Sequence, residues 1–192
     1  MNTSHESVST AGKYAPAITA EKYACATTTG YSSHATTTGD EAHATTTGYS
    51  SRATTAGGYA HATTAGDFAH ATTTGAYAHA TAASDFAHAA TTGDYAHAAT
   101  TGRLTYAATT GDYAHAATTG RLSNASVSGE NAIAAAFGAN SYARAANGGF
   151  IVLAQYDGDT VVAVKTAQVG KDGIKPDTWY ALSPTGEFIE SE

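Results

Sequence analysis

Most of the chain alternates small and large side chains with a period of nine residues. Alanine occupies the fifth position after a recurring glycine in each unit from Ala17 to Ala143, and the residue before that alanine is mostly histidine. Threonine fills most of the three positions that follow. This alternation beside β-branched residues predicts short strands with alanine facing inward and histidine outward. Ser84 replaces the glycine once in a series made up of Gly30, Gly39, Gly48, Gly57, Gly66, Gly75, Gly93, Gly102, Gly111, Gly120, Gly129 and Gly138. Glycine at this position indicates a turn that needs unusual backbone angles.

Longer motifs recur every second unit. Tyr31-Ser32-Ser33 returns as Tyr49-Ser50-Ser51, and Arg103-Leu104 returns as Arg121-Leu122, each 18 residues later. We therefore predict an all-β fold, a flattened β-solenoid or β-roll with two nine-residue repeats per turn, rather than a three-sided coil of 27 residues. Residues 10–148 would make roughly 7 to 8 turns, or ~35 Å at ~4.8 Å per turn.

The composition changes near residue 148. Residues 150–153 and 160–164 have strand-like sequences on either side of Asp157-Gly158-Asp159, and residues 179–189 have the pattern of a hairpin. We predict three parts: a disordered N-terminus at 1–9, a nonapeptide-repeat solenoid at 10–148 and a C-terminal β cap at 149–192. The last part is either an end cap, which such an open-edged fold needs, or a docking or trimerisation module.

Charge and composition narrow the function classes. The net charge is −7 and the pI is about 5.6, which disfavours nucleic-acid binding because a nucleic-acid-binding face is basic. A single cysteine, Cys25, excludes an internal disulfide framework. No stretch approaches the ~20 apolar residues of a membrane span. The first residues lack the basic and apolar regions of a secretory signal, so we expect the protein in the host cytoplasm or in a virion.

Tandem units such as residues 89–97 (AATTGDYAH) resemble those of a group of phage and prophage proteins that carry nonapeptides of this type. The segment 174–180 (IKPDTWY) is similar to the C-terminal signature of that group, and 131–138 (NAIAAAFG) fits its transition. The resemblance covers about residues 30–190. It implies a phage or mobile-element origin and no established activity. The repeats also resemble, more distantly, the head repeats of trimeric adhesins. Neither resemblance transfers a functional residue.

The histidine column carries the most unusual candidate chemistry. With 18 residues per turn, one face would stack His43, His61, His79, His97 and His115, and the other would hold His34, His70 and His88. Imidazole is the commonest metal ligand, but a flat column offers ligands from one direction only, and a tetrahedral site needs convergence. We therefore predict structural stacking with no metal or cofactor. Protonating several stacked histidines near pH 5–6 should lower stability.

Aromatic and threonine columns suggest binding surfaces. The aromatic set Tyr59, Tyr77, Tyr95 and Tyr113 serves either as packing or as a stacking platform for bases or sugars. Outward pairs such as Thr36/Thr38, Thr45/Thr47 and Thr72/Thr74 suggest ice binding, although alanine interrupts the columns at Ala56 and Ala65.

Catalysis has little support, because Asp94 and His97 recur as Asp112 and His115 and a catalytic group is not normally repeated. We predict a non-enzymatic, phage-associated protein that presents a regular surface for protein binding or structure. The histidine and tyrosine columns with Asp94 and Asp112 are its candidate binding residues. The alternatives are an anti-defence inhibitor or signal sponge, a virion or adhesin fibre segment, and an ice-binding solenoid. Its partner would be a host or phage protein, or a second or third copy of itself. The inhibitor alternative could use spaced acidic residues, which Arg103 and Arg121 interrupt: Asp40, Glu41, Asp67, Asp85, Asp94 and Asp112.

Overall fold

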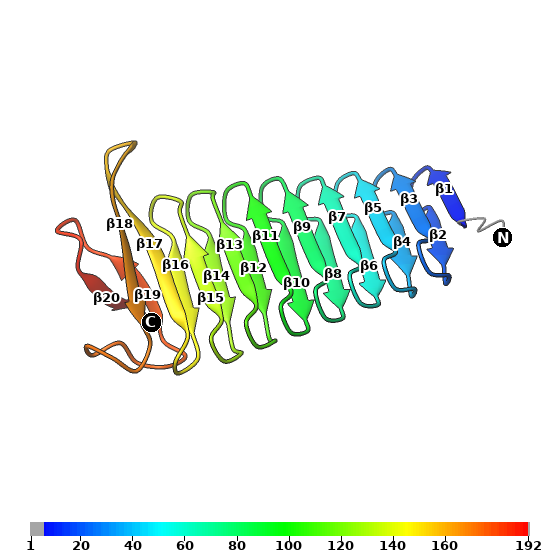
Figure 1. The fold of residues 1–192 in the computed structure, drawn as a ribbon. Helices are drawn as coiled ribbons and strands as arrows, with labels where there is room; N and C mark the ends of the chain where they lie inside the picture. Colours follow the sequence, from blue (N-terminus) through cyan, green and yellow to red (C-terminus); the bar gives the residue numbers. More distant parts are fainter. Residues whose placement is uncertain (1–5, 192) are drawn as a thin grey trace.

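A computed structural model describes residues 6–191, which form a two-layered β-solenoid (Figure 1). The chain winds in stacked parallel coils of about 18 residues, about 8 turns in all. Two ten-stranded sheets form the layers, and the described residues contain no helix. The predicted all-β solenoid with two nonapeptides per turn is therefore confirmed, and the three-sided coil is excluded.

Successive strands alternate between the two sheets. The first sheet contains β1 (Ser7–Ala11), β3 (Cys25–Thr29), β5 (His43–Thr47), β7 (His61–Ala65), β9 (His79–Ala83), β11 (His97–Thr101), β13 (His115–Thr118), β15 (Ile133–Ala136), β17 (Phe150–Asp157) and β18 (Thr160–Gln168). The second contains β2 (Pro16–Thr19), β4 (His34–Thr37), β6 (Arg52–Ala56), β8 (His70–Thr74), β10 (His88–Thr92), β12 (Tyr106–Thr109), β14 (Asn124–Val127), β16 (Tyr142–Ala145), β19 (Trp179–Leu182) and β20 (Phe188–Ser191).

The parallel register repeats the sequence period. In the pair β5–β7, His43 lies opposite His61 and Ala44 opposite Ala62. Alanine of this column is buried throughout the coils, and so is the threonine two residues later, whereas the histidine faces outward, as the alternation predicts. The core is therefore made of methyl groups and threonine side chains between two sheets. Each methyl contributes only about 0.8 kcal/mol, so the backbone ladders carry much of the stability.

The recurring glycine meets two demands of the turn. The expected unusual angle occurs in part of the series, with φ between 125° and 157° at Gly30, Gly48, Gly66, Gly75 and Gly102. Gly93 has no such angle, yet a Cβ there would collide with the carbonyl oxygen of Gly75, one coil earlier. Close approach of consecutive turns therefore requires glycine even where the angle does not, and the residue two positions later, such as Tyr95 with φ 57°, is in the left-handed region.

The two ends differ from the predicted boundaries. Residues 7–9 belong to β1, which pairs with β3, so the expected disorder is wrong for them, and residues 1–5 lie outside the described part. At the other end, β17 still pairs in parallel with β15 as far as Leu153, because Ile151 and Leu153 continue the inner columns. The coil pattern therefore ends after Leu153 rather than at residue 148.

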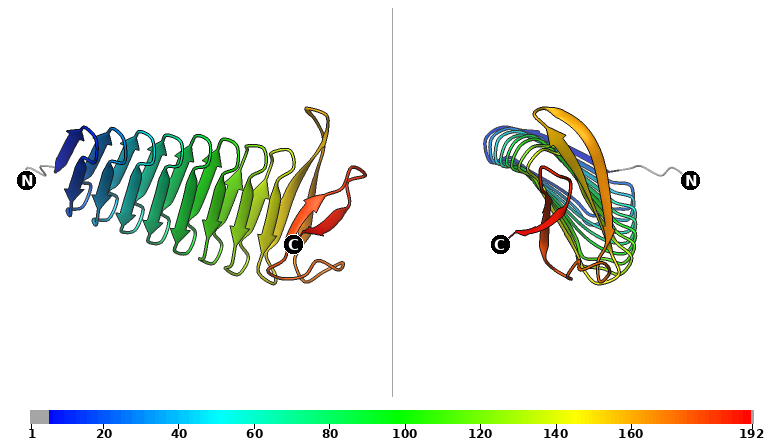
Figure 2. Two further views of the ribbon diagram at one scale, coloured as in Figure 1. Left: turned by 180° about the vertical axis from the view of Figure 1, so that it is seen from behind. Right: turned by 90° about the vertical axis from the view of Figure 1, so that its left-hand side faces the viewer.

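Antiparallel strands terminate the solenoid. The long hairpin β17–β18 ends the first sheet, and the hairpin β19–β20 joins β16 of the second (Figure 2). Trp179 stabilises the contact of this hairpin with the second sheet. The guanidinium carbon of Arg144 lies 4.6 Å from the centre of the Trp179 ring, and the ring also packs against Tyr106. Both hairpins match the strand-like segments expected from the sequence.

Candidate binding face

Five histidines form one continuous stack on the first sheet. Each begins a strand from β5 to β13, and neighbouring ring centroids are 4.8, 4.8, 4.9 and 5.0 Å apart from His43 to His115. The ring planes are within 17° of parallel. The separation equals the strand spacing of a β-sheet, so the parallel register alone aligns the imidazoles.

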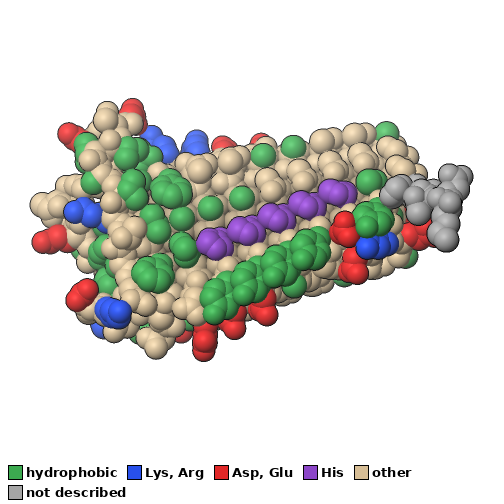
Figure 3. Space-filling model, in the orientation of Figure 1, with side chains coloured by type: hydrophobic (Ala, Val, Ile, Leu, Met, Phe, Trp, Pro, Cys, Tyr) green, Lys and Arg blue, Asp and Glu red, His purple; other side chains and the backbone are tan. Residues whose placement is uncertain are grey.

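Four tyrosines form a second stack beside the histidines, at the edge where the chain enters the first sheet. Tyr59, Tyr77, Tyr95 and Tyr113 have ring centroids 4.9, 5.0 and 5.1 Å apart and planes within 6°. Each precedes a histidine by two residues, so the two rows run side by side (Figure 3). We call the surface made by these nine rings the histidine–tyrosine face.

The stacking decides what the tyrosine rings can do. Each inner ring, such as Tyr77 or Tyr95, has a neighbouring ring over both faces. Only ring edges and hydroxyl groups are presented to solvent, so inner rings cannot also stack on a base or a sugar. The interpretation of the column as packing fits this geometry, and a stacking platform does not.

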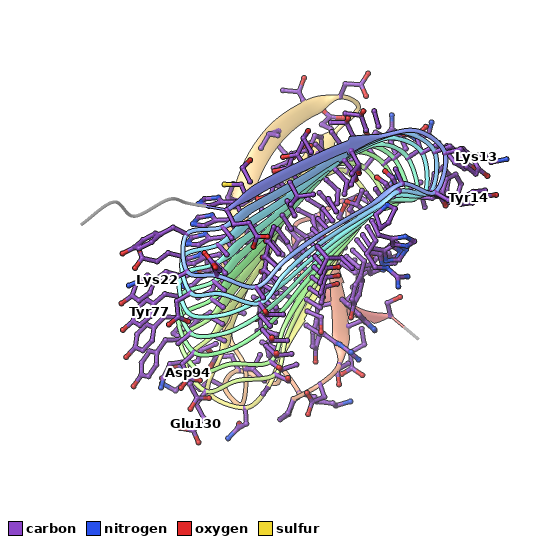
Figure 4. The ribbon with its side chains drawn as sticks, turned by 90° about the vertical axis from the view of Figure 1, so that its right-hand side faces the viewer. Lys13, Tyr14, Lys22, Tyr77, Asp94 and Glu130 are labelled. Atoms are coloured by element: carbon purple, nitrogen blue, oxygen red, sulfur yellow. The ribbon has the colours of Figure 1, made fainter. Side chains whose placement is uncertain are left out.

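The predicted Asp94 and Asp112 lie in turns at the same edge, where Figure 4 labels Asp94 near Tyr77, and their carboxylates are held by the backbone. Asp94 Oδ1 accepts a hydrogen bond of 3.1 Å from the backbone N–H of Asp112, and Asp112 Oδ1 accepts one of 2.7 Å from Glu130 N–H. Asp40 Oδ1 likewise accepts a hydrogen bond of 2.8 Å from the backbone N–H of Gly58. These carboxylates tie each turn to the next, while their charge stays exposed at the border of the histidine–tyrosine face.

The wider acidic stripe does not form. Asp67 and Asp85 lie in turns from the first sheet to the second, on the opposite edge from Asp40, Asp94 and Asp112. Arg103 and Arg121 share that opposite edge. The reason is the two-repeat coil, which sends alternate turns to opposite edges, so evenly spaced acidic residues are divided between them.

The second sheet carries a shorter counterpart. His70 and His88 stack at 4.9 Å, and Arg52 lies between His34 and His70 in the register. At the adjoining edge Phe68 and Phe86 stack at 4.7 Å. The same edge also carries Tyr14, Tyr31 and Tyr49, which continue the aromatic row from Phe68, so this row spans five coils while the histidine stack beside it has only two rings.

Burial, in part with repulsion by neighbouring charges, favours the neutral form of four histidines. Burial lowers the pKa of His61 and His97 below 6.5, and the neighbouring histidines lower it further. Burial is also the main cause of the lowered pKa of His70 and His88. These four rings are uncharged at neutral pH, so they expose neutral hydrogen-bonding edges rather than cations.

The face does not assemble a metal centre in the described residues. No group of three or more His, Cys, Asp or Glu side chains converges there in a way that could hold an ion. The rings are parallel and point in one direction, as the flat column predicts, whereas a metal site draws ligands from several directions.

Outward threonine pairs occur but do not extend into a lattice. Both threonines of a pair are present on β3 and β5 of the first sheet, and in the units of β4 and β8 on the second. Between those last two units, Ala56 replaces the second threonine. The regular array that an ice-binding face needs is therefore short on both sheets.

A hollow that the sequence pattern did not predict lies at the N-terminal end of the tyrosine stack. Glu41 occupies the position of a tyrosine between Tyr23 and Tyr59, and a cavity of about 370 Å³ opens there, lined by these three residues with His43 and His61. The signal was available: the column has an aromatic residue at 23, 59, 77, 95 and 113, and Glu41 is the exception.

No known family model, curated protein or solved structure matches this chain. In residues 6–191 there is also no helix long and apolar enough to cross a membrane.

Proposed function

We propose that this protein is a non-enzymatic, phage-associated rod that binds a partner protein through the histidine–tyrosine face. One observation carries the proposal: a stack of five histidines and an adjacent stack of four exposed tyrosines are both held at strand spacing. Tyrosine combines apolar area with a hydroxyl group and is enriched in protein interfaces.

The face is organised before it meets a partner. Its rings are fixed by their neighbours, so binding immobilises few additional rotamers, and this lowers the entropic penalty of association. The neutral imidazoles and phenolic hydroxyls supply hydrogen-bonding groups, and the bordering Asp94 and Asp112 add negative charge that favours a partner with basic residues at the rim.

The phage association rests on the resemblance of the repeats and of residues 174–180 to phage and prophage proteins. Under that association the partner is either a host defence or DNA-processing protein, or a structural protein of the virion. An inhibitor binds the host protein, whereas a fibre segment, as a dimer or trimer, assembles with the structural protein of the virion.

Affinity capture from phage-infected host lysate, with three forms of the protein, tests the proposal. The face variant carries Tyr77→Ser, Tyr95→Ser, His79→Asn and His97→Asn. Serine and asparagine already occupy these positions in other coils, at Ser32, Ser50 and Asn124, so the fold accommodates them. The matched control makes the same changes on the other side: Phe68→Ser, Phe86→Ser, His70→Asn and His88→Asn.

We expect a partner that the wild type and the control variant retain and the face variant loses, with the same difference on repetition with the purified partner. A host protein would assign the antagonist role, and a capsid or tail protein would assign the fibre role. Recovery of one set of proteins by all three forms, or of none by the wild type, would refute the proposed face.

A further inference from the structure

The gap at Glu41 interrupts the tyrosine stack by one ring. Tyr23, Glu41 and Tyr59 occupy equivalent turn positions, with φ of 63°, 55° and 57°, and the backbone N–H of each bonds to the following turn in the same way. At ~4.8 Å per coil, the two tyrosines are ~10 Å apart along the rod, about twice the separation of neighbouring rings in the stack.

The gap leaves one aromatic face exposed. Tyr59 is 56% exposed, against 42% for Tyr77 and 43% for Tyr95, each of which lies between two rings. Tyr59 stacks on Tyr77 on one side, and the cavity of about 370 Å³ lies on the other. A planar group entering this cavity would take the place of the missing ring and cover the open face of Tyr59.

The Glu41 carboxylate in the cavity lining favours a planar group with a positive charge. Glu41 Oε1 is 3.2 Å from the ammonium of Lys22, and the carboxylate is half exposed. The Lys22 ammonium lies 4.7 Å from the centre of the Tyr23 ring. The protein therefore already places a cation of its own beside Glu41 and against the aromatic ring of Tyr23. In Figure 3 the row of hydrophobic side chains beside the histidines gives way, toward the N-terminal end, to acidic and basic side chains.

We propose that the gap between Tyr23 and Tyr59 binds the guanidinium group of an arginine side chain. A guanidinium is planar, so it stacks on the open face of Tyr59, and its fork of N–H donors reaches the Glu41 carboxylate. The imidazole edges of His43 and His61 line the same cavity and provide further acceptors when neutral. Ammonium groups and quaternary amines lack either the plane or the donors for both contacts.

Lys22 competes with the arginine for Glu41. Its ion pair is half exposed, 55% for the lysine and 43% for the glutamate, so solvent screens it and its displacement requires little energy. Removal of the lysine should consequently strengthen binding of the arginine side chain.

An NMR titration of the purified protein with N-acetylarginine amide tests the site, without any partner protein. We expect saturable shifts of the Tyr59 ring resonances, and weaker binding of N-acetyllysine amide and tetramethylammonium. Glu41→Gln should reduce the affinity about tenfold, and Lys22→Ala should increase it. Tyr59→Ser should abolish the shifts of the neighbouring His61. Glu130→Gln is the control, because it removes an exposed carboxylate away from the gap and should leave the affinity unchanged.

Equal affinity for the arginine and lysine probes would overturn the assignment, and so would an unchanged affinity in Glu41→Gln. Glu41 is half exposed and lies outside the core, so this variant does not depend on refolding of the core. The arginine site goes beyond the proposed binding of a partner protein. The titration can show arginine binding when affinity capture recovers no partner, and affinity capture can recover a partner when the titration shows no binding.

Discussion

Replacement of Thr73 by valine should stabilise the protein, although it removes a hydroxyl group from the core. The Thr73 side chain is fully buried between the two sheets, and its Oγ1 has no hydrogen-bond partner within residues 6–191. A buried hydroxyl left unpaired is unfavourable by about 1–3 kcal/mol. Valine has nearly the same shape, suits a strand, and already occupies the same column of the second sheet at Val127. We expect the free energy of unfolding to rise by about 1–2 kcal/mol.

Thr100 provides the matched comparison on the first sheet. It is equally buried, but its Oγ1 lies 2.7 Å from Oγ1 of Thr105, which also hydrogen-bonds to Ser123 at 3.0 Å. Thr100→Val removes a satisfied hydrogen bond and should lower the free energy of unfolding by about 1 kcal/mol. In thermal melts followed by circular dichroism, Thr73→Val should melt about 2–8 °C above the wild type. A Thr73→Val protein that melts no higher than Thr100→Val would refute the reasoning.

The remaining predictions concern pH, the turns and ice. His61 and His97 have a folded-state pKa below the 6.5 of the unfolded chain, so their stabilisation is complete above pH 6.5 and is lost as the pH falls through their folded-state values. The melting temperature should therefore be lower at pH 5 than at pH 8. The double variant His61→Asn/His97→Asn should lose less melting temperature over the same pH change. An unchanged melting temperature in the wild type would contradict this expectation. Gly93→Ala should lower the melting temperature, because its methyl group would collide with the Gly75 carbonyl. In Gly148→Ala the new methyl group meets open space, so stability should fall only through the positive φ of that residue. Urea unfolding of both variants would measure the contrast. Thermal hysteresis should be absent, because paired outward threonines form no extended array, and faceted ice growth in the presence of the protein would overturn that expectation.

The repeat made most of the fold predictable from the sequence. The 18-residue recurrence of Tyr31-Ser32-Ser33 set the coil length, and the alternation around His61 set which side chains face outward; both are confirmed by the register of β5 and β7. Local alternation is informative here because a strand in a solenoid must bury one face against a partner of the same pattern. The stacking of the histidines followed from the register without further assumptions.

Other features depend on contacts that no local pattern contains. Glycine at position 93 indicated an unusual angle, but the demand comes from Gly75 in the preceding coil, and Tyr95 carries the left-handed angle. Asp94 was expected to contribute to a binding surface, and its carboxylate also ties one turn to the next. The cavity at Glu41 could not be predicted from local pattern alone, because it forms where one non-aromatic residue interrupts a stacked column of rings.

The two-repeat coil also makes the protein sensitive to the parity of its repeats. Nearly identical repeats invite misalignment when the gene is copied or recombined. Loss of a single nonapeptide within the series would exchange the two sides for every residue that follows, so that the successors of His79 would join the column of His70 and the long row of rings would be split between opposite sides. Loss of two nonapeptides would keep every later residue on its own side and shorten the rod by one strand spacing. Changes in length that preserve the histidine–tyrosine face therefore come in pairs of repeats, and the number of coils can vary while the pattern of the surface is inherited intact.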